Sequence, residues 1–461
     1  MKIRFAGAAQ TVTGSRNLLS FRNKTILIDA GLFQGPKDSR LLNWNPDFTP
    51  KKIDAIILSH AHIDHSGLIP KLYKEGFRGP IYCSKSTFDL CSIMLVDSAH
   101  LQEEDAKYAN VSGYSHHSPA LPLYTIEDAK ESLELFYTIP QNEWKDLFDG
   151  LSIRLTRSGH ILGSSFVEIS FVENDVTQKI TYSGDLGNGR SQIIKPPTHI
   201  EETDYLVLES TYGDRLQPRV DPKIPLAEVI NKVFNRQGIL VIPSFTVGRT
   251  QDILHLIQTL KSEQAIPNVS VYVDSPMANA ANKIFLKHFE EHQIVMDKND
   301  HLIAPITLTD FTAITNMEDS KKLVSKTTPS IIITASGMLT GGRVMHHLKE
   351  RLPNPKNAVL FVGYQALNTK GRLLQEGLKK IRIHHQEIPV EAEIITMEGL
   401  SAHADYQDTL EWLTHLKKVP KMIFINHGEK VAAESLKKRI EEKFNFPCTI
   451  PRYMEEFKLN M

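Results

Sequence analysis

The stretch Ile53-Asp-Ala-Ile-Ile-Leu-Ser-His-Ala-His-Ile-Asp-His65 joins an apolar run directly to a cluster of metal-ligand residues. Its first six residues are typical of a short buried strand, so His60, His62, Asp64 and His65 follow where that strand ends and a loop begins. A strand end holds ligands in fixed geometry, and a loop leaves their far side open to a substrate. Imidazole and carboxylate groups together suit zinc or a similar divalent ion. The stretch predicts a centre for two metals about 3.5–4 Å apart; the alternative is a His-rich surface loop.

Length, composition and charge narrow the class of protein. The chain has 461 residues, which suits two or three domains. Hydrophobic residues make up 41% and charged residues 23%, as in soluble globular proteins. The formal net charge is −1, so a polyanion would have to be held by a local patch or by the metals themselves. No signal peptide and no membrane span is expected. Cys83, Cys91 and Cys448 show no Cys-x-x-Cys spacing, which favours a reducing, cytoplasmic location.

Other apolar strands also end in His, Asp or Glu. Between about residues 211 and 388 the pattern changes to alternating strands and helices, which predicts a parallel, doubly wound sheet. The expected architecture is α/β, with residues 1–210 and 389–461 forming one metal-binding domain that is interrupted by an α/β domain over 211–388. The residues at or just beyond the strand ends are Asp29, His160, Asp185, Glu209, His403 and His427.

Seven side chains form a set of ligands large enough for two metals. We expect Asp185 to bridge the ions and Asp29 to orient a ligand or the attacking water. Taken singly, His160, Asp185 and His427 could equally be turn residues satisfied by the backbone. Three His-His doublets, at 116–117, 346–347 and 384–385, lack a preceding strand and are interpreted as surface or helix residues. The first metal is assigned His60, His62 and His160, and the second Asp64, His65 and His427.

These motifs resemble those of the metallo-β-lactamase-fold nucleases of the β-CASP group, which includes bacterial and archaeal RNA nucleases and the eukaryotic pre-mRNA 3′-end cleavage endonuclease. Asp29, the run from His60 to His65, His160 and Asp185 match the lactamase-fold motifs. Glu209, His403 and His427 look like the group's motifs A, B and C. The resemblance implies an αββα sandwich with two zinc ions, manganese being the alternative, and an inserted domain that leaves a cleft for a nucleic-acid strand. A histidine in motif C is the RNA-processing form.

The chemistry expected of such a site is hydrolysis of RNA phosphodiester bonds by metal-bound hydroxide. His403 is the expected general acid, with Glu209 keeping it charged and oriented. Asp64 and Asp29 are grouped with these two as catalytic residues. The alternative for His403 is a residue of the N-cap region ahead of the following helix. We expect internal cleavage of single-stranded RNA, with 5′-to-3′ trimming as a second mode.

Three strand-to-helix turns of the insert resemble the group's substrate loops. Ser, Gly and Arg at such turns form an anion-binding wall, since backbone N–H groups there can hold phosphate. The alternative for the arginines is a position on the helix surface. The expected substrate-binding residues are Ser244, Arg249, Ser336, Gly337, Arg343, Gln365 and Arg372.

Some features of the group are missing from this sequence. No KH-like segment precedes residue 1, and no RNase J-like C-terminal domain follows the last helix, so the grip on RNA is expected from the cleft or from a homo-oligomer. Two other functions remain open. One is a small-molecule hydrolase of the same fold, acting on a thioester, lactone or sulfate ester, and the other is a non-catalytic RNA-binding scaffold.

Overall fold

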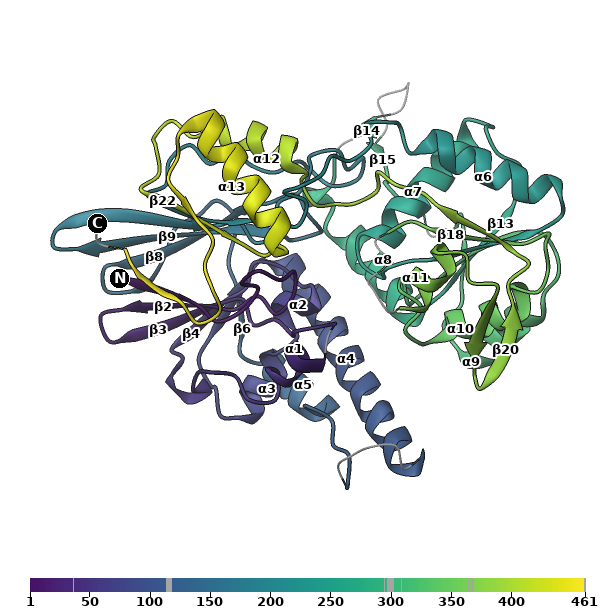
Figure 1. The fold of residues 1–461 in the computed structure, drawn as a ribbon, viewed down its shortest axis with the longest axis horizontal. Coiled ribbons are helices and arrows are strands. Elements are labelled where there is room, and N and C mark those ends of the chain that lie inside the picture. The colour runs from purple at the N-terminus through teal and green to yellow at the C-terminus, as the bar shows by residue number, and fades with distance from the viewer. Residues whose placement is uncertain are drawn as a thin grey trace. The chain divides into compact units, whose positions relative to one another are not determined.

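The computed structural model describes residues 1–35, 37–112, 118–293, 295–296, 302–307, 309–363, 365 and 369–459. The chain divides into two compact units (Figure 1). Unit 1 contains Met1–Arg190, Lys195–Leu216 and His403–Met461, and unit 2 contains Ser191–Ile194 and Gln217–Ala402.

Unit 1 is built on two seven-stranded sheets. The first has the order β24-β1-β2-β3-β4-β5-β6 and the second the order β23-β22-β11-β10-β9-β8-β7. In β8 (Leu151–Arg157), Leu151, Ile153 and Leu155 alternate with half-buried residues, the period expected of a strand with one face in a core. The remaining strands are β1 Lys2–Phe5, β2 Asn17–Phe21, β3 Lys24–Ile28, β4 Ala55–Ile57, β5 Ile81–Cys83, β6 Phe136–Thr138, β7 Lys145–Phe148, β9 Ser165–Glu173, β10 Val176–Tyr182, β11 Tyr205–Glu209, β22 Met422–Asn426, β23 Cys448–Thr449 and β24 Glu456–Lys458.

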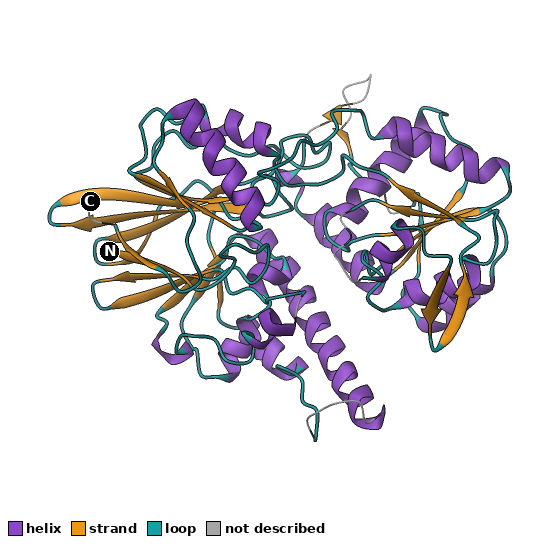
Figure 2. Ribbon diagram, in the orientation of Figure 1, coloured by secondary structure: helices purple, strands orange, loops and turns teal. Residues whose placement is uncertain are grey.

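The main core of unit 1 lies between these sheets. It contains Ile3, Phe5 and Leu19 from the first sheet, packed with Val167 and Phe171 from the second. Helices cover the outer faces, with α12 and α13 over the second sheet and α3, α4 and α5 over the first (Figures 1 and 2). The helices are α1 Lys37–Leu41, α2 Ile63–Ser66, α3 Ile69–Lys74, α4 Lys85–Ser112, α5 Ile126–Leu133, α12 Tyr406–Leu413 and α13 Lys430–Phe444, with a 3-10 turn η1 at Pro50–Lys52. The αββα sandwich expected from the sequence is confirmed.

One local expectation was wrong. Asp64 and His65 lie in the helical turn α2, not in a loop, with His62 as its N-cap residue. The carbonyl of His62 accepts hydrogen bonds from the backbone N–H of His65 (2.9 Å) and of Ser66 (2.8 Å). The spacing of Asp64 and His65 is therefore that of a helical turn.

Unit 2 is the parallel α/β domain that the alternating pattern predicts. Its six-stranded sheet has the order β16-β13-β17-β12-β18-β21, and neighbouring strands pair in parallel. The strands are β12 Ile239–Pro243, β13 Ser270–Asp274, β16 Thr312–Ala313, β17 Ser330–Thr334, β18 Ala358–Phe361 and β21 Glu393–Thr396, with ribbons β14–β15 (Val295–Met296, Leu302–Ile303) and β19–β20 (Lys380–Ile383, Gln386–Pro389). The helices are α6 Lys223–Asn235, α7 Arg249–Ser262, α8 Pro276–Lys287, α9 Met317–Ser325, α10 Arg343–Arg351 and α11 Lys370–Gln375, with a 3-10 turn η2 at Phe289–Glu291.

The second unit ends later in the chain than residue 388. Strand β21 pairs with β18 in the register Ala358↔Glu393, so backbone hydrogen bonds hold residues 393–396 in the sheet of unit 2. The chain returns to unit 1 at His403. The sequence-based division had grouped β21 with the second part of the metal-binding domain.

Two further observations concern the environment of the protein. Within the described parts of the chain, no helix is both long and apolar enough to cross a membrane. Cys83, Cys91 and Cys448 are buried free thiols. The cytoplasmic location stays a prediction.

Candidate metal centre and active site

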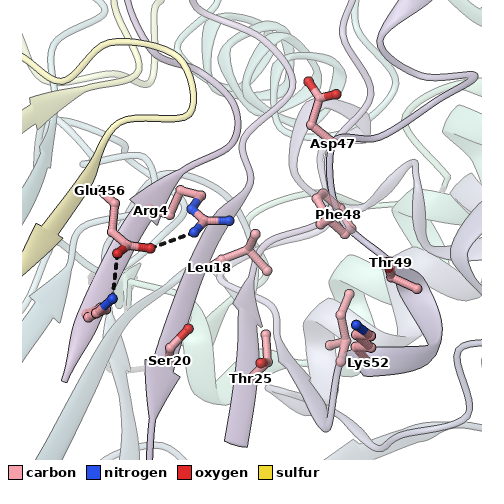
Figure 3. A pocket seen from close by; sticks show the side chains of 11 residues that line it. Arg4, Leu18, Ser20, Thr25, Asp47, Phe48, Thr49, Lys52 and Glu456 are labelled. Atoms are coloured by element: carbon pink, nitrogen blue, oxygen red, sulfur yellow. Dashed lines mark hydrogen bonds and ion pairs between the residues drawn. The ribbon is translucent and has the colours of Figure 1, made fainter.

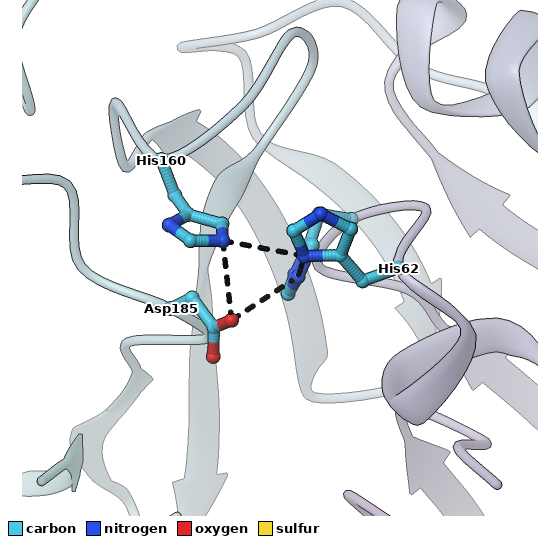
Figure 4. A group of neighbouring side chains, drawn as sticks. His62, His160 and Asp185 are labelled. Carbon is cyan, nitrogen blue, oxygen red and sulfur yellow. Dashed lines mark hydrogen bonds and ion pairs between the residues drawn. The ribbon is translucent and has the colours of Figure 1, made fainter. Parts of the chain in front are cut away.

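Residues from distant parts of the sequence meet at one end of the unit 1 sandwich. His60 follows β4, His160 follows β8, Asp185 follows β10 and His427 follows β22. Figure 4 shows His62, His160 and Asp185 directed toward a common point. Three groups of potential ligand atoms form there among the described residues, each with its atoms within 4.8 Å of one another. The first contains His60, His62, His160 and Asp185, the second Asp64, His65 and His427, and the third Asp185, Glu209 and His403.

The first group has the spacing of a tetrahedral metal site. The Nδ1 atom of His62 lies 3.1 Å from Nε2 of His60 and 3.3 Å from Nε2 of His160. The Oδ2 atom of Asp185 lies 3.4 Å from Nε2 of His60 and 3.3 Å from Nε2 of His160. Bonds of about 2.0–2.1 Å to zinc give a tetrahedron with edges of about 3.3–3.4 Å. These four side chains therefore fit a zinc ion in both chemistry and spacing.

The second group is looser and shares Asp185. The Nε2 atoms of His65 and His427 are 3.1 Å apart, and Oδ2 of Asp64 lies 3.9 and 3.6 Å from them. The Oδ1 atom of Asp185 lies 3.2 Å from Nε2 of His65. The two carboxylate oxygens of Asp185 thus face different groups, which is the geometry of a bridging ligand.

Asp29 supports both the second group and the loop that carries it. Its carboxylate accepts hydrogen bonds from the backbone N–H of Ser59 (2.7 Å) and from the Ser59 hydroxyl (2.8 Å), and it lies 2.6 Å from Nδ1 of His65. A carboxylate on Nδ1 leaves Nε2 of His65 free to bind a metal. Asp29 and His427 both have positive φ, of 57° and 48°, so non-glycine residues with unusual backbone conformation lie at this site.

Glycine is required where the loops supporting the site touch. A Cβ atom at Gly31 would lie 1.6 Å from the carbonyl oxygen of Asp64. The backbone N–H of Ser15 donates to that same carbonyl at 2.8 Å. Contact between bare backbone segments therefore fixes the helical turn that presents Asp64 and His65.

Protonation differs between the two groups. Burial lowers the pKa of His60, His62 and His160, in the case of His62 to about 3, and neighbouring imidazoles add to this effect. These rings are neutral at pH 7, the form that binds metal. Burial also opposes the charge on His65, but the carboxylates of Asp185 and Asp29 outweigh it and raise its pKa well above the usual value.

His403 lies beside the candidate metal ligands and is paired with Glu209. Its Nδ1 atom is 3.1 Å from Oε1 of Glu209, and its ring centroid is 4.4 Å from that of His160. Burial lowers the pKa of His403, but the carboxylates of Glu209 and Asp185 outweigh it and raise the pKa to about 10. The helix N-cap expected for this region is Asp405, which accepts hydrogen bonds from the N–H groups of residues 407 and 408. His403 stands two residues before this N-cap, and its side chain faces Glu209.

The sequence-based interpretation missed residues that support the site. Ser59 holds Asp29, and its place as the first letter of Ser-His-Ala-His was the available signal. The hydroxyls of Ser15 and Tyr182 lie 2.5 Å apart beneath the site, and nothing in their spacing indicates this contact. The ring of Tyr212 lies 5.8 Å from that of His403, and Tyr212 stands three residues after Glu209 in the sequence.

The predicted substrate-binding residues of unit 2 lie at the carboxyl ends of β12, β17 and β18, but several are committed to internal contacts. Ser244 is buried and its hydroxyl lies 3.3 Å from that of Thr250. Arg343 donates to Oδ1 of Asp274 (2.8 Å) and to the carbonyls of residues 314 and 315. Gln365 is buried and donates to Gly337.

Of the remaining predicted substrate-binding residues, Ser336 and Arg372 are more accessible than Arg249. Ser336 is half-buried, with its hydroxyl 2.9 Å from that of Thr340. Arg372 keeps 40% of its side chain exposed while it pairs with Glu376. Arg249 lies 3.9 Å from Asp252 with 10% of its side chain exposed. The doublet 116–117 lies outside the described residues.

A separate pocket of about 300 Å³ lies on unit 1 (Figure 3). Lys2 and Arg4 line it and both pair with Glu456, at 2.9 and 2.6 Å. Its lining contains no imidazole or thiol, so the catalytic centre is not there.

An αββα sandwich with a His- and Asp-rich centre at its strand ends defines a metal-dependent hydrolase of the metallo-β-lactamase fold. Comparison with known families agrees along the chain. Residues 18–227 match the metallo-beta-lactamase superfamily, 250–374 the Beta-Casp domain, and 387–451 the Zn-dependent metallo-hydrolase RNA specificity domain.

Individual relatives give the same result. The chain is 34% identical over 438 residues to Ribonuclease TTHA0252 of Thermus thermophilus, covering 93% of this chain and 94% of that protein. It is 28% identical over 473 residues to transcription termination factor FttA of Methanocaldococcus jannaschii, covering 100% of this chain and 72% of that protein. A solved structure of a protein of unknown function from Enterococcus faecalis shares the fold, with a TM-score of 0.55 at 14% identity over 99% of both chains.

The chain belongs to the β-CASP family of RNA nucleases of the metallo-β-lactamase fold. It is a metal-dependent hydrolase of RNA. Membership of this family supports neither of the two alternative functions considered from the sequence, a small-molecule hydrolase and a non-catalytic RNA-binding scaffold.

Proposed function

We propose that this enzyme is a two-zinc endoribonuclease of the cytoplasm that cleaves single-stranded RNA, with 5′-to-3′ exonuclease activity as a second mode. The observation that carries the proposal is the position of Asp185, whose two oxygens face two separate groups of ligand atoms. The half-buried imidazole of His403 adjoins them.

The proposed ligands are His60, His62 and His160 for one ion, Asp64, His65 and His427 for the other, and Asp185 for both. Donor spacings close to a tetrahedral edge support zinc in the first group, with manganese as the alternative. Bound there, two divalent cations would polarise a phosphoryl oxygen and lower the pKa of a water molecule toward neutrality. Asp29 would keep the ring of His65 oriented through its contact with Nδ1.

His403 is proposed as the general acid. Because Glu209 holds Nδ1, it is the Nε2–H group that would give its proton to the leaving oxygen as the oxygen of a hydroxide ion, formed when water releases a proton to solvent, bonds to phosphorus and the P–O bond to the leaving group breaks. Glu209 is itself fixed, since its Oε1 atom accepts a hydrogen bond from the backbone N–H of Leu186 at 2.7 Å. Because the Glu209 carboxylate is held in place, it would keep the His403 imidazole protonated and fixed in orientation.

Recognition of RNA is proposed to use the turns of unit 2. Ser336 and Arg372 have the accessible hydroxyl and charge that a phosphate would need. Ser244, Gly337 and Gln365 would contribute by shaping these turns. Arg249 and Arg343 would contribute through their positive charge. A homo-oligomer would extend the surface available to a long RNA.

The test is incubation of the protein with end-labelled single-stranded RNA and with DNA of the same sequence, with and without a chelator. We expect RNA to be cut internally, activity to vanish with chelator, and zinc to restore it. If the exonuclease mode operates, a 5′-monophosphorylated RNA would additionally release mononucleotides. Metal-loaded, folded protein that leaves RNA intact would refute the proposed function.

A further inference from the structure

Phe245 is an exposed aromatic residue at the carboxyl end of β12 in unit 2. Its fractional exposure is 43%, although it follows the five buried residues of β12 and the buried Ser244. Single exposed apolar residues are ordinary on protein surfaces. What distinguishes Phe245 is how firmly its surroundings hold it.

The backbone of Phe245 is fixed from both sides. Its carbonyl accepts hydrogen bonds from the hydroxyl (2.7 Å) and the backbone N–H (3.2 Å) of Thr250, in the first turn of α7. The preceding N–H, of Ser244, donates to the carbonyl of Thr334 at 3.0 Å. The ring is therefore presented by a rigid strand-to-helix turn.

Two glycines border one edge of the ring. A Cβ atom at Gly337 would lie 3.3 Å from Cδ2 of Phe245 and 3.1 Å from its backbone nitrogen. A Cβ atom at Gly363 would lie 3.6 Å from Cε2. One edge of the ring thus packs on bare backbone from the turns after β17 and β18, while 43% of the residue stays exposed.

Gln365 ties these two turns together. Its Nε2 atom donates to the carbonyl of Gly337 at 2.9 Å and to that of Gly363 at 3.3 Å, and the residue is 3% exposed. Its Oε1 atom lies 1.7 Å from the position that a Cβ atom would take at Gly371, so glycine is required there. The buried amide of Gln365 therefore holds together the two turns that border the ring of Phe245.

The topology of the sheet places Phe245 beside a switch point in the strand order. Strand β12 lies between β17 and β18. The chain leaves β12 through α7 toward β13 on one side, whereas it leaves β18 through α11 toward β21 on the other. Where connections diverge in this way, parallel α/β sheets bind ligands beyond the carboxyl ends of their strands.

We propose that Phe245 is a stacking platform for one unpaired base of the RNA substrate. A rigid, half-exposed ring offers a flat apolar face, and every base can stack on such a face, so the contact would tolerate any sequence. The inference rests on the proposed function, because it requires a single-stranded RNA substrate. A base in a duplex has no face free to stack on an aromatic ring. Arg372, with 40% of its side chain exposed after the same strand as Gly363, supplies charge for the backbone of that RNA.

The test compares Phe245→Leu with the wild type in the full-length protein. Leucine keeps an apolar side chain against the two glycines but has no π face. The probe is an end-labelled single-stranded RNA 12-mer, together with versions that carry one abasic ribose at each position. We expect Phe245→Leu to raise KM about 5- to 100-fold with little change in kcat, and Phe245→Trp to restore KM. Phe289→Leu, at a position 70% exposed in the same unit, is the matched control and should behave as wild type.

Abasic RNA supplies the decisive comparison. One abasic position should weaken binding to the wild type by the same factor as Phe245→Leu, and should weaken the variant no further. The platform is wrong if Phe245→Leu and Phe289→Leu bind RNA alike, or if every abasic effect adds to that of Phe245→Leu. If the wild type neither binds nor cuts RNA, the proposed function fails together with the stacking platform. If only the stacking platform is wrong, the wild type still cuts RNA. Thermal unfolding of each variant checks that it is folded.

Discussion

The strand ends of unit 1 and those of unit 2 carry similar polar residues but use them differently. At the end of the unit 1 sandwich, candidate ligands from four segments of the chain converge, with imidazole and carboxylate atoms lying 3.1–3.4 Å apart in the first group. In unit 2, Arg343 faces Asp274 and backbone carbonyls, and Gln365 faces glycine carbonyls. Imidazole nitrogens and carboxylate oxygens that face one another at this spacing suit a bound metal ion. Hydrogen-bond donors that already have acceptors, such as those of Arg343 and Gln365, stabilise the fold.

The largest effect is expected from Asp185→Ala. Because Asp185 contributes an oxygen to each ligand group, its loss should empty both metal positions and reduce RNA cleavage by at least about three orders of magnitude. Elemental analysis of the purified protein and a cleavage assay measure this. Asp149→Ala, at a side chain 95% exposed, is the control. Retention of one tightly bound ion would contradict a bridging role.

His403→Ala should separate acid catalysis from metal binding. We expect cleavage to fall about 10²- to 10⁴-fold, the usual contribution of a general acid, while metal content stays unchanged. His346→Ala, on an exposed position of α10, should have no effect on either. If metal content falls with activity, His403 is a ligand, a role for which its place near Asp185 and Glu209 also leaves room.

Arg343→Ala and Arg372→Ala test whether the arginines of unit 2 differ in kind. Arg343 pairs with the fully buried Asp274, so its removal should reduce the free energy of unfolding by about 2–4 kcal/mol. Arg372 pairs with Glu376 at the surface, and its removal should change stability by less than about 0.5 kcal/mol while weakening RNA binding. Chemical denaturation and RNA binding measure the two quantities. Equal stability losses would remove the distinction.

Glu209→Gln should change the pH profile of cleavage. The carboxylate of Glu209 favours the protonated form of His403, so its neutralisation lowers that pKa. The alkaline limb of kcat should therefore move to lower pH. Above its pKa, the protonated fraction of an acid falls about tenfold for each pH unit. At a fixed pH on the alkaline limb, kcat of the variant should therefore fall by the same factor as the protonated fraction of His403. Measuring kcat across the alkaline range tests this, and an unmoved limb would mean that another group sets it.

The smallest effect concerns the stability of unit 2 in acid. Burial lowers the pKa of His347 below its usual 6.5, although its Nε2 atom lies 2.7 Å from Asp274. The unfolded chain therefore binds more protons than the folded one below pH 6.5, and stability should rise with pH through that range. His347→Gln should flatten this slope, which denaturant unfolding at a series of pH values would detect. A slope equal to that of the wild type would show that His347 does not titrate on unfolding.

The sequence by itself determined the kind of chemistry. Four ligand-type residues directly after an apolar strand, and His, Asp or Glu after others, indicated a metal centre because parallel strands bring their carboxyl ends to one edge. The alternation of strands and helices likewise predicted the parallel sheet of unit 2. These patterns are local, so they can be read residue by residue.

Only the tertiary structure decided which polar groups already have partners. That Arg343 is held by Asp274, that Gln365 bridges two glycines, and that Ser59 supports Asp29 depend on contacts between segments far apart in the chain. Strand β21 belongs to the sheet of unit 2 for the same reason. A side chain's partner is set by the packing of several elements at once, and no spacing along the sequence records it.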